Sequence, residues 1–148
     1  MDRSLVLIKP DAIQRGLAGE IISRLEKKGL KIVAMKMLHI DRNLAQRHYA
    51  IHKGKAFFDD LVNFITSSPL IAIIFQGKNA VEVIRQMMGE TDPAKASGGS
   101  IRGDFGLDIV HNLVHGSDSL ENASKEIDLF FSVAEIFNYD RELDTWIY

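Results

Sequence analysis

The chain has 148 residues, 46% of them hydrophobic and 26% charged, and its net charge is −2. This length suits one domain, residues 1–148, with a single core. The small acidic excess gives no general attraction to nucleic acid or anionic membranes, so neither is expected as a partner. There is no cysteine, which excludes disulfides and thiolate metal sites and is compatible with the cytoplasm. No apolar run is long enough to cross a bilayer.

Apolar runs and helical spacings predict the order β-α-β-α-β-α-β-α. In chain order we expect a strand at 5–8, a turn at 9–11, a helix ending at Gly29, a strand at 30–38, short helices around a loop near Gly54, a helix with one apolar face from Phe57 to Ile65, a strand at 70–75, a helix ending near Gly89, a loop at 89–106, a strand at 109–115 and a helix from Leu120 to Phe130. Two split β-α-β halves of this kind favour a ferredoxin-like sandwich with helices covering one face of the sheet. A doubly wound parallel sheet has the same alternation and remains the alternative at this point.

The stretch from Asn112 to Ser119 is the most informative part of the chain. His115 lies where a predicted strand gives way to residues that favour a helix N-cap, namely Ser117, Asp118 and Ser119. Free backbone N–H groups and the positive end of a helix dipole attract anions such as phosphate at such a junction. Because imidazole is also a nucleophile, the pattern indicates a histidine that takes up a phosphoryl group.

Glu126 lies at the edge of the apolar face of the following helix, pointing partly inward. A carboxylate there can accept a proton from one imidazole nitrogen and leave the other free to attack. Taken alone, Glu126 is also compatible with a solvated helix charge, and His115 with a structural histidine at a strand end.

Two histidine pairs have a four-residue spacing that suggests a shared metal ion. His48 and His52 are four residues apart, but the glutamate of H-E-x-x-H and a third ligand are absent, which disfavours zinc. His111 and His115, if both lie on one strand, are ~13 Å apart at ~3.3 Å per residue and cannot share an ion.

The sequence contains no glycine-rich phosphate loop of the G-x-x-x-x-G-K-[ST] or G-x-G-x-x-G type. A bound nucleotide would therefore be held by side chains. Arg85 and Arg102 offer forked donors that match phosphate oxygens, and Thr91 lies between them in the chain. Taken alone, each arginine is more typical of a solvated surface than of a phosphate site.

Together, several segments closely resemble the nucleoside diphosphate kinase family along the whole chain. They are Ile8-Lys9-Pro10-Asp11, Gln14-Arg15-Gly16-Leu17, Gly19-Glu20-Ile21-Ile22, His48-Tyr49, Gly89-Glu90-Thr91-Asp92-Pro93-Ala94, Ile101-Arg102-Gly103-Asp104-Phe105 and the N-x-x-H-G-S-D-S signature from Asn112 to Ser119.

This resemblance implies a ferredoxin-like α/β sandwich with an antiparallel sheet. It also implies transfer of the γ-phosphate of ATP or another nucleoside triphosphate to nucleoside diphosphates, by a ping-pong cycle through a phosphohistidine. Mg²⁺ would be held mainly by the nucleotide, with no direct protein ligand. The implied catalytic residues are His115, Glu126, Lys9, Tyr49, Asn112 and Ser117, and the implied nucleotide contacts are Lys9, Phe57 (stacking on the base), Arg85, Thr91, Arg102, Asn112 and Gly116. On this basis we expect Lys9→Ala and Arg102→Ala to weaken transfer far more than folding.

Members of the family form tetramers or hexamers. The tail Trp146-Ile147-Tyr148 resembles hexameric members, so a homohexamer is favoured over a tetramer. Four positions depart from common members: Gly98 replaces a frequent proline, Asp59 and Asp60 a frequent Pro-Gly, and His111 a basic or small residue. A non-catalytic nucleotide-binding protein on the same fold, and a metal-dependent hydrolase using His48 and His52, are the competing functions.

Overall fold

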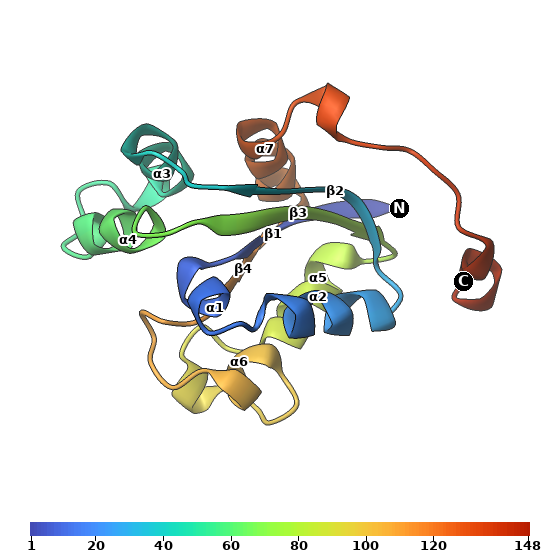
Figure 1. Cartoon of the computed structure of the whole chain (residues 1–148), viewed down its shortest axis with the longest axis horizontal. Coiled ribbons are helices and arrows are strands. Elements are labelled where there is room, and N and C mark those ends of the chain that lie inside the picture. The colour runs from blue at the N-terminus through green and yellow to red at the C-terminus, as the bar shows by residue number, and fades with distance from the viewer.

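The computed structural model describes residues 1–148 and is built on a four-stranded sheet (Figure 1). The strands are β1 (Asp2–Ile8), β2 (Lys31–Leu38), β3 (Leu70–Gly77) and β4 (Val114–Gly116). Their order is β2-β3-β1-β4, and every neighbouring pair is antiparallel. This is the ferredoxin-like arrangement, and it excludes the doubly wound parallel sheet.

Helices cover both faces of the sheet, so the expectation of one covered face was wrong (Figure 1). The α-helices are α1 (Pro10–Gln14), α2 (Ala18–Lys27), α3 (Arg42–His48), α4 (Phe58–Ile65), α5 (Ala80–Met88), α6 (Ile101–Phe105) and α7 (Leu120–Phe130). Helices α3, α4 and α7 lie on one side, and α1, α2, α5 and α6 on the other. Short 3-10 helices lie at Ala50–His52, Pro93–Lys95, Val133–Glu135 and Glu142–Trp146.

The central strand explains the two layers. Leu5 and Leu7 of β1 enter one core, and Val6 and Ile8 enter the other. A strand that is apolar on both faces must be covered on both faces, because each exposed face would leave hydrocarbon in water. No helix in the structure is long and apolar enough to span a membrane.

The largest difference from the predicted elements precedes the signature histidine. The strand expected at 109–115 is reduced to β4, and Ile109 and Val110 are about half exposed. Apolar, β-branched residues do not form a strand without a partner to pair with and a face to bury. Since His111 lies outside β4, the strand-based separation from His115 does not apply.

Three smaller differences concern segment ends. The turn expected at 9–11 is the start of α1, with Pro10 in its first turn, where a missing N–H is harmless. The loop expected at 89–106 contains the 3-10 helix Pro93–Lys95 and α6. Phe57 precedes α4 and is 46% exposed, so it is not part of the apolar face expected from Phe57 to Ile65.

The chain after α7 follows the outer strand β2 and then reaches the turn between α2 and β2, where Arg141 donates to the Gly29 and Leu30 carbonyls (Figure 1). The Phe137 N–H donates to the Val33 carbonyl at 2.8 Å, and the Tyr139 hydroxyl donates to the Ile32 carbonyl. Trp146, near the end of this segment, is exposed.

Candidate active site around His115

His115 is held in place by the short strand β4. It lies opposite Leu7 of β1 in the sheet register, and Gly116 lies opposite Val6. A Cβ atom on Gly116 would approach Met88 Sδ to 2.9 Å and Ile84 Cγ2 to 3.1 Å, so glycine lets β4 lie this close to α5 without displacing these buried side chains.

A chain of polar contacts supports the His115 ring from behind. Glu126 Oε2 of α7 lies 3.0 Å from His115 Nε2, and the Ser117 hydroxyl donates to Glu126 Oε1 at 2.6 Å. The Leu5 N–H donates to Ser117 Oγ at 3.1 Å, which connects this chain to the central strand. The Glu126 oxygen lies close to Nε2 but off the direction of an aligned hydrogen bond, as is common in catalytic sites before substrate binds.

Helix α7 begins where the sequence predicts, and its start fixes the direction in which Glu126 points. Ser119 is its N-cap, and the Ser119 side chain accepts a hydrogen bond from the Asn122 N–H at 3.1 Å. The buried residues Ala123 and Phe130 set the face that turns toward the sheet, and Glu126 lies at the edge of that face.

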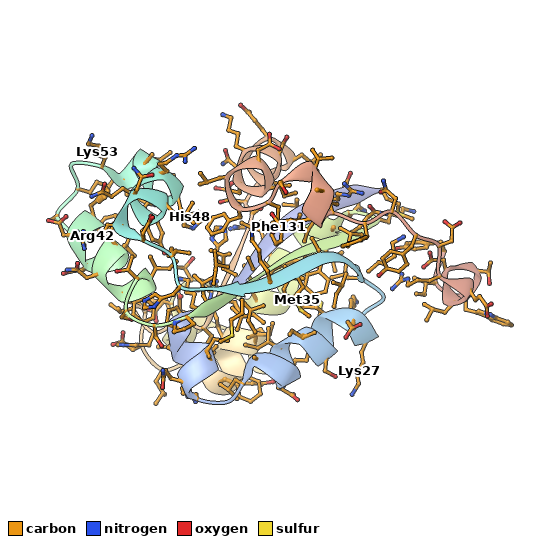
Figure 2. The ribbon with its side chains drawn as sticks, turned by 45° about the horizontal axis from the view of Figure 1, so that its top comes forward. Lys27, Met35, Arg42, His48, Lys53 and Phe131 are labelled. Carbon is orange, nitrogen blue, oxygen red and sulfur yellow. The ribbon has the colours of Figure 1, made fainter.

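A second imidazole, which the sequence analysis did not place in this site, lies behind Glu126. Figure 2 shows His48 in the space between α3 and α7. Its Nδ1 is 4.0 Å from Glu126 Oε2, and its ring meets the His115 ring edge-on at a centroid distance of 4.7 Å. Burial, with smaller contributions from His115, Lys9 and His52, holds the pKa of His48 well below its usual range, so the ring is neutral. The sequence signals for this position were its spacing from His52 and its place beside Tyr49 in a family segment, and neither pointed to Glu126.

His48, His115 and Glu126 form the one group of three side chains that could hold a metal ion, with ligand atoms within 4.8 Å of one another. The earlier pairing of His48 with His52 is therefore not the one that the structure forms. Two nitrogens and one carboxylate oxygen are a donor set for zinc or other transition metals, whereas Mg²⁺ prefers oxygen ligands.

Lys9 and Asn112, the first residue of the signature, form a buried pair. Lys9 Nζ donates to Asn112 Oδ1 at 2.8 Å, and Asn112 Nδ2 donates to the Thr91 carbonyl at 3.1 Å. The Asp11 carboxylate accepts a hydrogen bond at 3.0 Å from the N–H of Leu113, a residue with φ of 75°. Burial, followed by the nearby Arg102 charge, lowers the pKa of Lys9 to about 8.

The two arginines expected near phosphate lie in different environments. Arg102 is buried and donates to three backbone carbonyls, those of Asn112, Gly89 and Val114, at 3.1, 3.1 and 2.7 Å. Burial and the charge of Arg85 lower the pKa of Arg102 to about 10. Arg85 is exposed, and both arginines line a hollow of about 400 Å³.

The remaining expected residues lie farther out or beside these groups. Tyr49 is nearly buried next to the His48 ring, and burial with the Glu126 charge raises the pKa of its hydroxyl above the ordinary value. Phe57 is half exposed, with the His52 ring at 5.3 Å and the Lys55 ammonium at 5.6 Å from its ring centroid. Thr91 is exposed.

The nucleoside diphosphate kinase family model matches residues 2–136. The chain belongs to the nucleoside diphosphate kinase family. It is 57% identical over 148 residues to the nucleoside diphosphate kinase of Pelotomaculum thermopropionicum, covering 100% of this chain and 99% of the relative. It is 56% identical to that of Archaeoglobus fulgidus, covering 100% and 98%. Its relatives are transferases, and the activity that these matches support for this chain is that of a nucleoside diphosphate kinase.

Solved structures of the family agree with the fold. A nucleoside diphosphate kinase of Halobacterium salinarum, solved in complex with CDP, superposes with a TM-score of 0.97 at 49% identity, covering 99% of this chain and 98% of that one. The apo enzyme of Encephalitozoon cuniculi gives 0.96 at 40% identity, with full coverage of both chains. The ferredoxin-like fold expected from the resemblance is thus confirmed.

Proposed function

We propose that this kinase transfers the γ-phosphate of ATP, or of another nucleoside triphosphate, to nucleoside diphosphates through a phosphohistidine on His115. The main support for this proposal is that the two nitrogens of the His115 ring have different surroundings. Nε2 faces Glu126, whereas Nδ1 has no partner in the protein and is not buried. A carboxylate on Nε2 favours the tautomer in which Nδ1 keeps its lone pair.

The cycle has two half-reactions at one site. The Nδ1 lone pair forms a bond to the γ-phosphorus, the bond from phosphorus to the bridging oxygen breaks, and the diphosphate leaves with that electron pair. A terminal oxygen of a second diphosphate then attacks the phosphorus and breaks the N–P bond, which restores Nδ1. Glu126 balances the positive charge on the phosphorylated ring through the proton on Nε2.

The surrounding groups would position the phosphates and neutralise their charge, which is most of what phosphoryl transfer requires. Of these, Lys9 and Asn112 are in mutual contact, and Arg85 and Arg102 line one hollow. We propose phosphate or ribose contacts for Lys9, Tyr49, Arg85, Thr91, Arg102 and Asn112, a backbone contact for Gly116, and support of Glu126 by the Ser117 hydroxyl.

Mg²⁺ would arrive with the nucleotide and be held by its phosphates, where it screens their negative charge. The nitrogen-rich group around His115 does not suit this ion, so no protein ligand is assigned.

Phe57 supports broad use of nucleobases. An exposed aromatic ring can stack on any base, because every base has a π-face. The relative from Halobacterium salinarum was solved with the pyrimidine nucleotide CDP. We propose that purine and pyrimidine diphosphates both serve as acceptors.

The decisive experiment incubates the enzyme with γ-labelled ATP and Mg²⁺ and then chases the label with ADP, GDP or CDP in turn. We expect an acid-labile, base-stable label on His115 that moves to each diphosphate. His115→Ala should carry no label, and Glu126→Gln should be labelled about 10- to 100-fold more slowly, because Glu126 orients the ring and does not attack. Full exchange by His115→Ala would contradict the proposal.

We further propose a cytoplasmic homo-oligomer, with a hexamer favoured over a tetramer. The exposed apolar side chains of the tail, Trp146 and Tyr148, support a role in subunit contacts. Sedimentation velocity of the full chain and of a chain lacking 146–148 tests this, since a tail that contributes to the hexamer should be needed for it.

A further inference from the structure

The unexplained feature of the site is the second imidazole, His48. Its side chain is 2% exposed, and neither ring nitrogen has a hydrogen-bond partner. Buried polar groups are nearly always paired, because an unpaired one has lost its hydrogen bonds to water without a replacement. A packing role alone would be served better by an apolar ring, so the two nitrogens call for another explanation.

The groups that face His48 come from three elements. Glu126 and Phe130 lie on α7, His115 on β4, and Tyr49 adjoins it at the end of α3. The Phe130 ring meets the His48 ring edge-on at a centroid distance of 5.4 Å, and the Tyr49 ring is tilted against it at 4.7 Å. These two aromatic rings pack against His48, whose Nδ1 lies 4.0 Å from Glu126 Oε2. The charges of Lys9, His115 and His52 oppose protonation of the ring, which agrees with a neutral His48.

We infer that His48 is a positioning residue for phosphoryl transfer: its ring directs an Nδ1–H dipole at Glu126 Oε2 and holds that carboxylate turned toward His115 Nε2. This inference rests on the proposed phosphohistidine function. At 4.0 Å the contact is too long for a hydrogen bond, so His48 acts as an oriented dipole and as a wall. The effect is significant because the site behind His115 is largely shielded from water, and electrostatic interactions are weakened less there than in bulk solvent.

The geometry predicts what this arrangement does during turnover. When the His115 ring becomes phosphorylated, its Nε2–H must be met by Glu126 in the same place as before. Glu126 is held from Oε1 by Ser117, and its Oε2 lies 3.0 Å from His115 Nε2 and 4.0 Å from His48 Nδ1. Without the His48 dipole, the carboxylate would be easier to protonate and freer to turn away from His115.

The first test uses the unmodified protein without nucleotide. Nitrogen-15 NMR of the histidine rings at neutral pH should show His48 neutral with its proton on Nδ1, and His115 with its proton on Nε2. A protonated His48, or a His48 with its proton on Nε2, would overturn the inference. This readout does not depend on activity, so it is separate from any failure of the proposed function.

The second test compares His48→Phe, His48→Asn and Phe130→Leu. Phenylalanine keeps the wall and removes the dipole, whereas the asparagine amide nitrogen can occupy the place of Nδ1. We expect His48→Phe to slow phosphoenzyme formation about tenfold with little change in KM for ATP, and to move the acid limb of its pH profile to higher pH. His48→Asn should restore most of the rate and the position of that limb.

Phe130→Leu is the control, because it loosens the same packing without touching a nitrogen. It should lower Tm and leave the acid limb where it is. Equal losses in His48→Phe and His48→Asn without a shifted limb, or a wild-type rate in His48→Phe, would overturn the inference. If the wild-type protein forms no phosphohistidine, the proposed function fails instead, and the NMR result still decides whether His48 orients Glu126.

Discussion

The inner wall of the site and its rim are built differently. The inner wall (Lys9, Arg102, Asn112, Ser117 and Glu126) is mostly buried, and each of its polar side chains already has a protein partner. The rim (Phe57, Arg85 and Thr91) is exposed, and the Arg85 guanidinium has no hydrogen-bond partner in the protein. A wall that is ordered before substrate arrives can orient the reacting groups, whereas a loosely held rim can accept bases of different shape.

Each region contains one arginine, and removing the two in turn should have different effects on stability. Arg102→Ala leaves three carbonyls without their charged donor and should destabilise the fold by at least about 3 kcal/mol, in addition to weakening transfer. Arg85→Ala should weaken transfer while changing stability by less than about 0.5 kcal/mol. Chemical denaturation and kcat/KM of both variants test this. Equal stabilities would show that the arginines do not differ in the way the structure indicates.

For Arg102 this revises the expectation from the sequence that its removal would affect transfer far more than folding. The sequence shows a cation in a glycine-rich segment. It does not show that three carbonyls, from the loop before α6 and from the signature, converge on that cation.

Burial of Lys9 in the inner wall should make both stability and activity depend on pH. Its pKa, about 8 in the folded protein against 10.5 ordinarily, means that the unfolded chain binds more protons between these values. Lys9 should therefore make stability rise as pH increases through that window, because charged Lys9 is penalised by burial below about pH 8. Binding of phosphate needs the charged form, so kcat/KM should fall up to tenfold per pH unit above about pH 8.

Lys9→Met provides the control for both measurements. Its kcat/KM should be low and lack the limb near pH 8, and the difference in unfolding free energy between wild type and variant should change across the same window. A wild-type profile without that limb would argue against a phosphate contact by Lys9.

At the rim, Phe57→Ala should weaken binding of ADP, GDP and CDP by similar factors, about 10- to 100-fold, because it removes stacking and no base-specific hydrogen bond. Calorimetry with the three diphosphates measures this. A loss confined to one base would show that the rim selects among bases, and Tm should be almost unchanged because the ring is half exposed.

The smallest expected effect lies at Gly98. The Ser100 N–H donates to the Ser97 carbonyl at 3.1 Å and Gly99 has φ of 94°, which is a type II turn with Gly98 in the position that favours proline. A Cβ at Gly98 meets nothing within 4 Å. Gly98→Pro should therefore stabilise the protein by about 0.4–1 kcal/mol, measured by denaturation, with Gly99→Pro as a destabilising control.

The parts of the fold that could be predicted are those with a strong local pattern. The buried runs at 5–8 and 70–75 lie in β1 and β3, and the capped helix from Leu120 to Phe130 is α7 as expected. The prediction of a strand at 109–115 was wrong because Ile109 and Val110, although typical strand residues, neither pair with another strand nor pack into a core. Whether an apolar residue is covered depends on tertiary neighbours, which a single sequence does not display.

The residues of the candidate site also fall into those that local sequence could place and those that it could not. Local sequence placed His115 beside a helix start and Glu126 at the edge of an apolar face, and the two side chains lie 3.0 Å apart. His48 could not be placed, because its neighbours Glu126 and His115 are distant in the chain and because spacing pointed only to His52. The roles of these residues in catalysis remain predictions, which the proposed experiments would test.

The contacts around His115 join distant parts of the chain. The Leu5 N–H and Ser117 Oγ are separated by 112 positions, and Lys9 and Asn112 by 103. During synthesis, these contacts cannot form until residues 112–117 have left the ribosome, and the contact of Ser117 with Glu126 must wait for α7 as well, so a nascent chain should be inactive until then. Recovery of phosphorylation after denaturation should accordingly report the last, slowest assembly of the central strand with its partner β4, and not the early formation of helices.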